Sequence, residues 1–306
     1  MALYRYTTYG LIVDSELSLP GLLLGPAGEA DVTIRFGPVP ASPEEFSEMG
    51  VGWQASGSVR LMTVVGVARF LIRENREIVI DPELTGRAND VANDVWVWLL
   101  GSILAALLYG RHILVLHGSV ICSHRGAVLL LGRNGVGKST LLAGMLKRDY
   151  TMLADDKAAI TVSAEGIAEV LPGYPLIRLT RDSVDALGYS CEESTYRAPI
   201  KKFILPVTRF SEVAAPLRAA YVLNTHNRGH IELERLTDLA GFEALREHLY
   251  RRRFVIGKGQ QLAMFRALVA SGRQAQITRV VRPEYPRLIG ELADRIDEDL
   301  RAGNAG

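Results

Sequence analysis

The sequence predicts an α/β protein that begins with a separate β-rich region. Residues 1–90 contain short runs in which apolar and polar side chains alternate, as in half-buried strands. Beyond residue 110, apolar runs alternate with segments of helical periodicity, and a glycine-rich loop joins one such run to a helix. At about 150 residues per domain, we expect a β-rich domain at residues 1–90 and an α/β domain with C-terminal helices at residues 91–306.

Strands account for most of the first region. Residues 31–36, Asp-Val-Thr-Ile-Arg-Phe, alternate strictly, and residues 59–72 and 77–80 are rich in β-branched side chains. The stretch Gly37-Pro38-Val39-Pro40 separates these runs as a turn. An apolar helix is expected to follow, from residue 91 to Gly110.

In the second region, residues 113–116 and 128–131 have the composition of strands buried on both faces. Further strands are expected at residues 150–154, 158–162 and 219–223, and a helix at residues 141–148. Two C-terminal helices are predicted from apolar side chains at helical spacing, namely Leu239, Phe242, Leu245 and Leu249 in one, and Leu288, Leu292, Ile296 and Leu300 in the other.

The composition, with 48% hydrophobic and 23% charged side chains, is that of an ordinary soluble globular chain. A net charge of +1 argues against nucleic-acid binding, and two cysteines are too few for a disulfide scaffold. The apolar run at residues 95–109 is shorter than the roughly 20 residues of a spanning helix. Since no signal peptide is recognisable either, we expect a cytoplasmic protein without membrane or nucleic-acid partners.

The charge is unevenly distributed along the chain. Residues 1–100, 101–200 and 201–306 carry net charges of −6, +1 and +6. The increase in net charge toward the C-terminus favours a second region that binds anions. The alternative is that surface charge varies along the chain without a functional reason.

Residues 132–139 read Gly-Arg-Asn-Gly-Val-Gly-Lys-Ser and match the pattern G-x-x-x-x-G-K-[ST] of phosphate-binding loops. The glycines permit the tight curl that points backbone N–H groups at phosphate oxygens. Lys138 would contact the β- and γ-phosphates and Ser139 would help to hold Mg²⁺, so ATP and Mg²⁺ are the expected cofactors. The expected nucleotide-binding residues are Gly132, Asn134, Gly135, Val136, Gly137, Lys138, Ser139 and Thr140.

Asp155 and Asp156 follow the loop after a single predicted helix and stand at the end of a predicted strand. Two adjacent acids at a strand end can divide two tasks, because one can hold Mg²⁺ while the other accepts a proton from an attacking hydroxyl. A solvated acidic turn before Lys157 is the alternative. His117, upstream of the loop, is either a structural or a catalytic histidine.

These motifs, in this order, resemble the catalytic core of HPr kinase/phosphorylase. The matching stretches are residues 116–119, 130–139 and 153–156, and the resemblance covers residues 113–165. It implies an HPr-kinase-type P-loop core, of the PEP-carboxykinase-like class, behind the β-rich domain. Members of the family often form homo-oligomers, so a homo-oligomer is one expectation, and the expected acceptor is a peptide or small protein that offers a serine hydroxyl.

The resemblance also implies roles for individual residues. Asp155 would be the general base that activates the serine hydroxyl, and His117 would lie against Asp155 to orient it. Lys138 would stabilise the transferred phosphoryl group. Asp156 would join Ser139 in binding Mg²⁺.

The sequence differs from the family pattern in two regions, one after the core and one at the N-terminus. The family's Glu-x-Arg-Gly-x-Gly signature, which is tied to reverse phosphorolysis, has no counterpart, because the nearest stretch, residues 173–179, lacks the acid and has no Gly-x-Gly after its arginine. Residues 9–20 resemble a divergent group of the family that includes the tailoring kinases of lasso-peptide gene clusters. Those kinases phosphorylate the C-terminal serine of a precursor peptide, and the β-rich domain would then help to recognise the acceptor.

Basic residues beyond the core are candidates for acceptor binding. Lysine is scarce, with six residues against 29 arginines, so the adjacent Lys201 and Lys202 stand out. This pair could neutralise phosphate or receive a peptide carboxylate, and a solvated pair beside a strand is the alternative. Residues 251–253, all arginine, are expected to end a helix, with the docking of an acidic peptide as the alternative.

The leading hypothesis is therefore an ATP- and Mg²⁺-dependent serine kinase, with a lasso-peptide precursor as the expected acceptor. The alternatives are an HPr-type regulatory protein kinase, a small-metabolite kinase and a nucleotide-switched ATPase module. The last is disfavoured because the sequence contains neither an LSGGQ-type signature nor a guanine-reading Asn-Lys-x-Asp motif.

Overall fold

The computed structural model describes residues 3–40, 48–50, 52–82, 95–192, 195–197, 200–227, 229–284 and 288–302. Contacts divide the chain into two compact units, of which the first comprises Met1–Ile113 and Arg251–Met264 and the second Leu114–Tyr250 and Phe265–Gly306. The division expected near residue 90 falls outside the described residues. The helix that ends at Gly110 groups with the first unit, because that is where its contacts lie.

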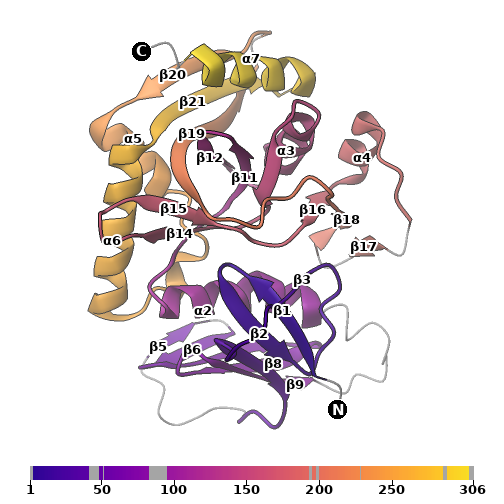
Figure 1. The fold of residues 1–306 in the computed structure, drawn as a ribbon, viewed down its shortest axis with the longest axis vertical. Coiled ribbons are helices and arrows are strands. Elements are labelled where there is room, and N and C mark those ends of the chain that lie inside the picture. Colours follow the sequence, from indigo (N-terminus) through magenta and orange to yellow (C-terminus); the bar gives the residue numbers. More distant parts are fainter. Residues whose placement is uncertain are drawn as a thin grey trace. The chain divides into compact units, whose positions relative to one another are not determined.

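Within the described residues, the first unit contains a nine-stranded sheet in the order β3-β1-β2-β4-β9-β8-β7-β6-β5 (Figure 1). The alternation predicted for residues 31–36 is confirmed in β4, where Val32 and Ile34 are buried and Thr33 is exposed. The strands are β1 (Tyr4–Thr8), β2 (Leu11–Ser15), β3 (Leu23–Leu24), β4 (Val32–Phe36), β5 (Glu48–Gly50), β6 (Trp53–Ser56), β7 (Val59–Val64), β8 (Ala68–Arg73) and β9 (Glu77–Pro82).

The apolar run that begins at Val95 forms a buried helix, as predicted. Residues 95–98 are helical, Leu99–Ile103 make a π-helical turn, and α2 (Leu104–Gly110) continues the helix. All side chains of α2 are buried, which explains why the segment is apolar on every face. Among the described residues, no helix has both the length and the apolar character needed to cross a membrane.

The second unit is built around β12 (Gly126–Gly132), β19 (Ala215–His226) and β21 (Gln276–Pro283), which pair in parallel with β19 in the middle (Figure 1). Since the carboxyl ends of parallel strands meet at one edge of a sheet, the loop after β12 lies at the edge where β19 and β21 end. β11 (Gly118–Ser123) forms a hairpin with β12, and β13 (Thr151–Ala154) pairs with the other side of β11.

The remaining elements surround these strands. A small sheet has the order β16-β18-β17, and β20 pairs with β21. The elements are β10 (Leu114–Leu116), β14 (Ala158–Val162), β15 (Ala168–Leu171), β16 (Leu176–Leu179), α4 (Arg181–Leu187), β17 (Tyr196–Arg197), β18 (Lys202–Pro206), β20 (Glu232–Leu236), α5 (Asp238–Arg246) and α7 (Ile289–Ala302).

Two features near the C-terminus differ from the sequence-based expectation. The helix α6 (Gly257–Gln274) was not predicted, because polar and glycine residues interrupt its apolar pattern and its Leu262 and Phe265 are exposed. Residues 251–253 do not end a helix. α5 ends at Arg246, and Arg252–Phe254 instead form a separate 3₁₀ turn.

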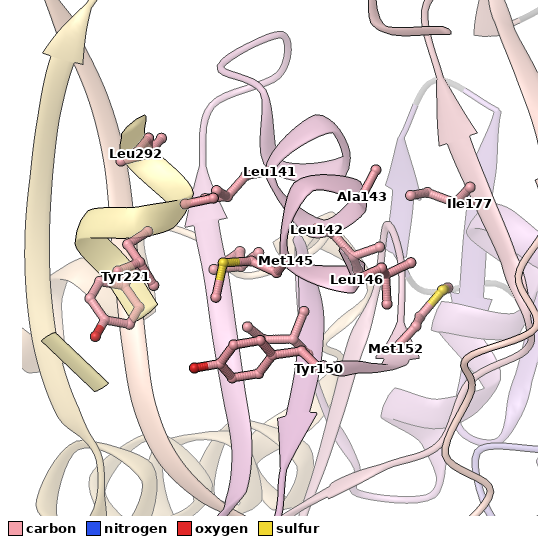
Figure 2. Packing of buried hydrophobic residues seen from close by; sticks show 14 of the residues in the cluster. Leu141, Leu142, Ala143, Met145, Leu146, Tyr150, Met152, Ile177, Tyr221 and Leu292 are labelled. Carbon is pink, nitrogen blue, oxygen red and sulfur yellow. The ribbon is translucent and has the colours of Figure 1, made fainter. Parts of the chain in front are cut away.

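The helix α3 (Lys138–Leu146) forms the centre of the second unit's core. It packs against α7, β11 and β16, and every side chain from Leu141 to Leu146 is buried. Figure 2 shows side chains on both sides of α3, among them Leu141 and Leu146, within this apolar cluster. Burial on every face explains why the helix has no polar stripe, and it anchors the loop that precedes it.

We expect Leu142→Ala to lower the free energy of unfolding by about 2–5 kcal/mol, because it leaves a cavity beside a fully buried helix. Leu239→Ala is the matched control, since Leu239 on α5 is 70% exposed, and its effect should stay within about 0.5 kcal/mol. Urea unfolding followed by circular dichroism measures both. Equal effects of the two substitutions would contradict this account of the core.

Candidate active site at the phosphate-binding loop

The glycine-rich loop joins β12 to α3, the context that the sequence predicts. Gly132, Gly135 and Gly137 have φ angles of 142°, 82° and 101°, a region that favours glycine. A Cβ on Gly132 would lie 2.7 Å from the carbonyl oxygen of Leu223 on β19, so a side chain does not fit there. No side chain in the described part of the chain caps the start of α3, which leaves its first N–H groups to bind an anion.

Lys138, the first residue of α3, folds back onto the loop. Its Nζ donates hydrogen bonds to the carbonyl oxygens of Gly132 at 2.8 Å and Arg133 at 3.1 Å, and it lies 3.2 Å from Nε2 of His117. An incoming phosphate offers anionic oxygens in place of these neutral carbonyls, and charge-assisted hydrogen bonds are the stronger kind. The ammonium is therefore positioned to exchange loop carbonyls for phosphate.

The pKa of Lys138 is lowered to about 8. Burial is the largest cause, since the residue is only 7% exposed, and the positive charge of Lys202 acts in the same direction. Asp155 and Asp156 oppose the shift. The ammonium is thus held in a site that disfavours its charge until an anion arrives.

Asp155, at the end of β13, is buried and accepts hydrogen bonds from three donors. Its Oδ1 accepts from the hydroxyls of Ser119 at 2.6 Å and Ser139 at 2.9 Å, and its Oδ2 accepts from the backbone N–H of Arg178 at 2.9 Å. Ser139 and Asp155 together offer the hard oxygen ligands that Mg²⁺ prefers. These two residues fit a magnesium site beside the loop.

Asp156 has a different environment from its neighbour. Its φ of 71° is unusual for a residue other than glycine. Its Oδ2 accepts from Nζ of Lys157 at 2.9 Å and from Nη1 of Arg178 at 3.0 Å. Burial opposes ionisation, but the charges of Arg178 and Lys157 outweigh it and hold the pKa of Asp156 well below its usual range.

The two acids therefore have the opposite partners from those expected. The resemblance implied that His117 lies against Asp155 and that Asp156 joins Ser139. In the structure, Ser139 bonds to Asp155, and Nδ1 of His117 lies 3.0 Å from the main-chain oxygen of Asp156 and 3.8 Å from its carboxyl oxygen. Both acids follow the last residue of β13, and the positive φ of Asp156 turns the backbone there, so each carboxylate meets different neighbours.

His117 lies between the loop and Asp156. Its Nε2 lies 2.6 Å from Oδ1 of Asn134, and its ring packs 5.8 Å from the ring of Tyr250, measured between centroids. Burial and then the charge of Lys138 lower the pKa of His117, against the opposing charge of Asp156. The imidazole is therefore neutral at pH 7.

Sequence reasoning missed three residues of this site, namely Ser119, Lys157 and Arg178. Arg178 carries a usable signal, since it is the charged residue in the apolar strand β16, and buried arginine requires an anionic partner. Lys157 is fully buried, and its Nζ lies 5.9 Å and 5.6 Å from the ring centroids of Tyr174 and Tyr250. Its position directly after two acids suggests a surface residue, so nothing local reveals the burial.

Other predicted residues of the loop have contacts of their own. The hydroxyl of Thr140 pairs with that of Ser183 at 2.8 Å, so the side chain of Thr140 is already engaged. The carbonyl oxygen of Val136 accepts a hydrogen bond from Nη2 of Arg282 at 2.7 Å, which ties the loop to β21.

Lys201 and Lys202 lie where β18 begins. Lys201 is exposed, with a φ of 53°, and Lys202 is half-buried and opposite Arg197 in β17. Lys202 is close enough to lower the pKa of Lys138, so this part of the small sheet belongs to the electrostatic surroundings of the loop.

No family model matches the chain, and no curated protein matches it. Among solved structures, the chain is similar to the Hpr(Ser) kinase/phosphatase from Coxiella burnetii, with 10% sequence identity and a TM-score of 0.35. The match covers 63% of this chain and 99% of that protein. At this TM-score the likeness carries no functional argument, so the function has to be inferred from the residues of this chain.

The pKa of Lys138 predicts how nucleotide affinity depends on pH. Lys138 is cationic below about pH 8 and a bound triphosphate stabilises the cation, so the dissociation constant for ATP should rise above that pH by up to about tenfold per pH unit. Calorimetric titration with a non-hydrolysable ATP analogue between pH 6 and pH 10 measures the midpoint.

A matched pair of variants tests the cause of this midpoint. Lys202→Ala removes a charge that lowers the pKa of Lys138 and should move the midpoint upward. Lys258→Ala, on the exposed start of α6, should leave it in place. An affinity that does not change with pH would contradict the assigned role of Lys138.

Proposed function

We propose that this chain is an ATP- and Mg²⁺-dependent kinase that transfers the γ-phosphoryl group to a serine hydroxyl of a peptide or small protein. The observation that supports this most is the convergence of two different acids on one phosphate-binding loop. Asp155 bonds to Ser139 of the loop, and Asp156 lies against His117. Nucleotide binding requires one acid that helps to hold Mg²⁺. A second acid can orient the attacking hydroxyl and accept its proton.

In the proposed reaction, Lys138 leaves the carbonyl oxygens of Gly132 and Arg133 and donates to the β- and γ-phosphates. Ser139 and Asp155 would hold Mg²⁺, which would supply positive charge to offset the charge of the phosphates. The metal-side acid in this proposal is therefore Asp155. This assignment differs from the one implied by resemblance, and its support is the hydrogen bond between Ser139 and Asp155.

Asp156 accepts a hydrogen bond from the serine hydroxyl and directs its oxygen at the γ-phosphorus. A bond forms from this oxygen to phosphorus, the bond to the bridging oxygen of ADP breaks, and the serine proton passes to Asp156 and then to water. The transition state of phosphoryl transfer is loose, so orientation matters more than base strength. The low pKa of Asp156 is compatible with that role, and neutral His117 holds its main chain.

The acceptor that we propose is the C-terminal serine of a lasso-peptide precursor. One support is the likeness of residues 9–20 to the tailoring kinases of lasso-peptide clusters. The other is the charge near the loop, because a C-terminal serine brings its own carboxylate close to the reacting hydroxyl. Lys202, whose charge reaches Lys138, is suited to receive that carboxylate together with Lys201.

Labelled phosphate transfer tests the proposal. The purified chain is incubated with γ-labelled ATP, Mg²⁺ and three acceptors: a peptide that ends in serine, a small HPr-like protein, and a mixture of hydroxylated metabolites. Label on the terminal serine is the expected result. Label on the protein or on a metabolite would replace the proposed acceptor, and ATP hydrolysis without any labelled acceptor would favour a nucleotide-switched module over a kinase.

Asp156→Asn is expected to lower kcat for phosphate transfer by about 10²–10⁴-fold while ATP still binds. Asp155→Asn should instead raise the Mg²⁺ concentration needed for half-maximal rate, because it alters the metal-side acid. Glu165→Gln is the matched control, since Glu165 is an exposed carboxylate between β14 and β15. Transfer by Asp156→Asn at the wild-type rate would rule out the proposed role of Asp156.

A thermodynamic cycle tests the carboxylate contact. Lys201→Ala should raise KM for a peptide with a free C-terminal carboxylate, and it should have no effect on the same peptide with a C-terminal amide. Lys201 is exposed, so the substitution should cost no more than about 0.5 kcal/mol of stability. Equal KM ratios for the two peptides would exclude a contact between Lys201 and the carboxylate.

A further inference from the structure

Among the residues that the structure describes, three potential metal ligands gather where β19 ends and β20 begins. His226 is the last residue of β19, Glu232 is the first residue of β20, and His230 lies on the connection between them. We propose that these side chains form a binding site for one Zn²⁺ ion, separate from the magnesium site proposed at Ser139 and Asp155.

The ligand atoms are close to the spacing that zinc requires. Nε2 of His230 lies 2.7 Å from Oε1 of Glu232, and Nε2 of His226 lies 3.9 Å from the same oxygen. One ligand atom from each residue lies within 4.8 Å of the other two. Tetrahedral coordination with bonds of about 2.0–2.1 Å places neighbouring ligand atoms about 3.3 Å apart, so small side-chain rotations complete the site.

The backbone holds two of the ligands in place. His226 is opposite Pro283 and Glu232 is opposite Val281, and both partners belong to β21. Ligands on hydrogen-bonded strands are positioned before the metal arrives, which lowers the entropic cost of binding. The metal would hold His230 against these two strand residues.

The chemistry of the three ligands favours zinc. Two imidazoles and a carboxylate are a common set for Zn²⁺, with a fourth position left for water, whereas Mg²⁺ and Ca²⁺ prefer oxygen ligands throughout. The side chains of His230 and Glu232 are 61% and 41% exposed, so an ion from solvent can reach them, whereas His226 is 17% exposed and presents a buried Nε2. Without metal, the contact between His230 and Glu232 is a surface pair, which contributes little to stability.

The test is a titration of the full chain, freed of metal by dialysis against a chelator, with ZnCl₂ in the calorimeter. Saturating Mg²⁺ is present to occupy the proposed magnesium site. We expect one Zn²⁺ per chain, a tetrahedral absorption spectrum with Co²⁺ as a substitute, and a melting temperature that rises with Zn²⁺ concentration.

His230→Ala and Glu232→Gln should each weaken Zn²⁺ binding by more than about tenfold. Substitution of a residue that only hydrogen-bonds to a metal ligand already lowers metal affinity by that factor, and these two residues are ligands themselves. Both side chains are exposed enough for the variants to fold, which circular dichroism checks. His124→Ala, an exposed histidine on the β11–β12 turn, should bind like the wild type, and so should Ser139→Ala. Wild-type affinity in both cluster variants, or no stoichiometric binding by the wild type, would overturn the site, and neither result depends on kinase activity.

Discussion

The buried carboxylate of Asp155 is the contact on which the candidate site depends. It accepts hydrogen bonds from Ser119 on β11, from Ser139 on α3 and from the backbone of Arg178 on β16. A buried carboxylate is costly unless its oxygens are satisfied, so these three elements are held in one arrangement. The glycine-rich loop is therefore positioned by the same residue that we propose as a magnesium ligand.

The neighbouring acid shows how adjacent residues acquire different chemistry. Asp155 accepts from hydroxyls and a backbone N–H, whereas Asp156 is paired with the cations of Lys157 and Arg178. These cations are themselves buried, and the charge of Asp156 raises the pKa of Arg178 against the effect of burial. The pairing keeps Asp156 ionised and holds it in an unusual backbone conformation, which directs its carboxylate and its main-chain oxygen toward separate partners.

Local pattern was a good guide to the elements and a poor guide to contacts. The loop at residues 132–139, the strand before it and the helix after it follow from glycine spacing and apolar runs, which are local properties. The apolar pattern of helix α6 is interrupted, so the sequence does not predict this helix. Nothing local identifies Lys157 as a site residue, because burial of its charge depends on residues distant in sequence, whereas Arg178 is marked by its charge within an apolar strand.

By itself, the sequence determined the α/β character, the glycine-rich loop between a strand and a helix, and the set of residues from which a site could be made. Backbone geometry explains this, because glycine at positive φ and runs of apolar side chains act within a few residues. Only the tertiary structure decided which acid accepts a hydrogen bond from Ser139 and which lies against His117. That choice depends on where β11 and β16 lie beside the end of β13, and no pattern along the chain records those distances.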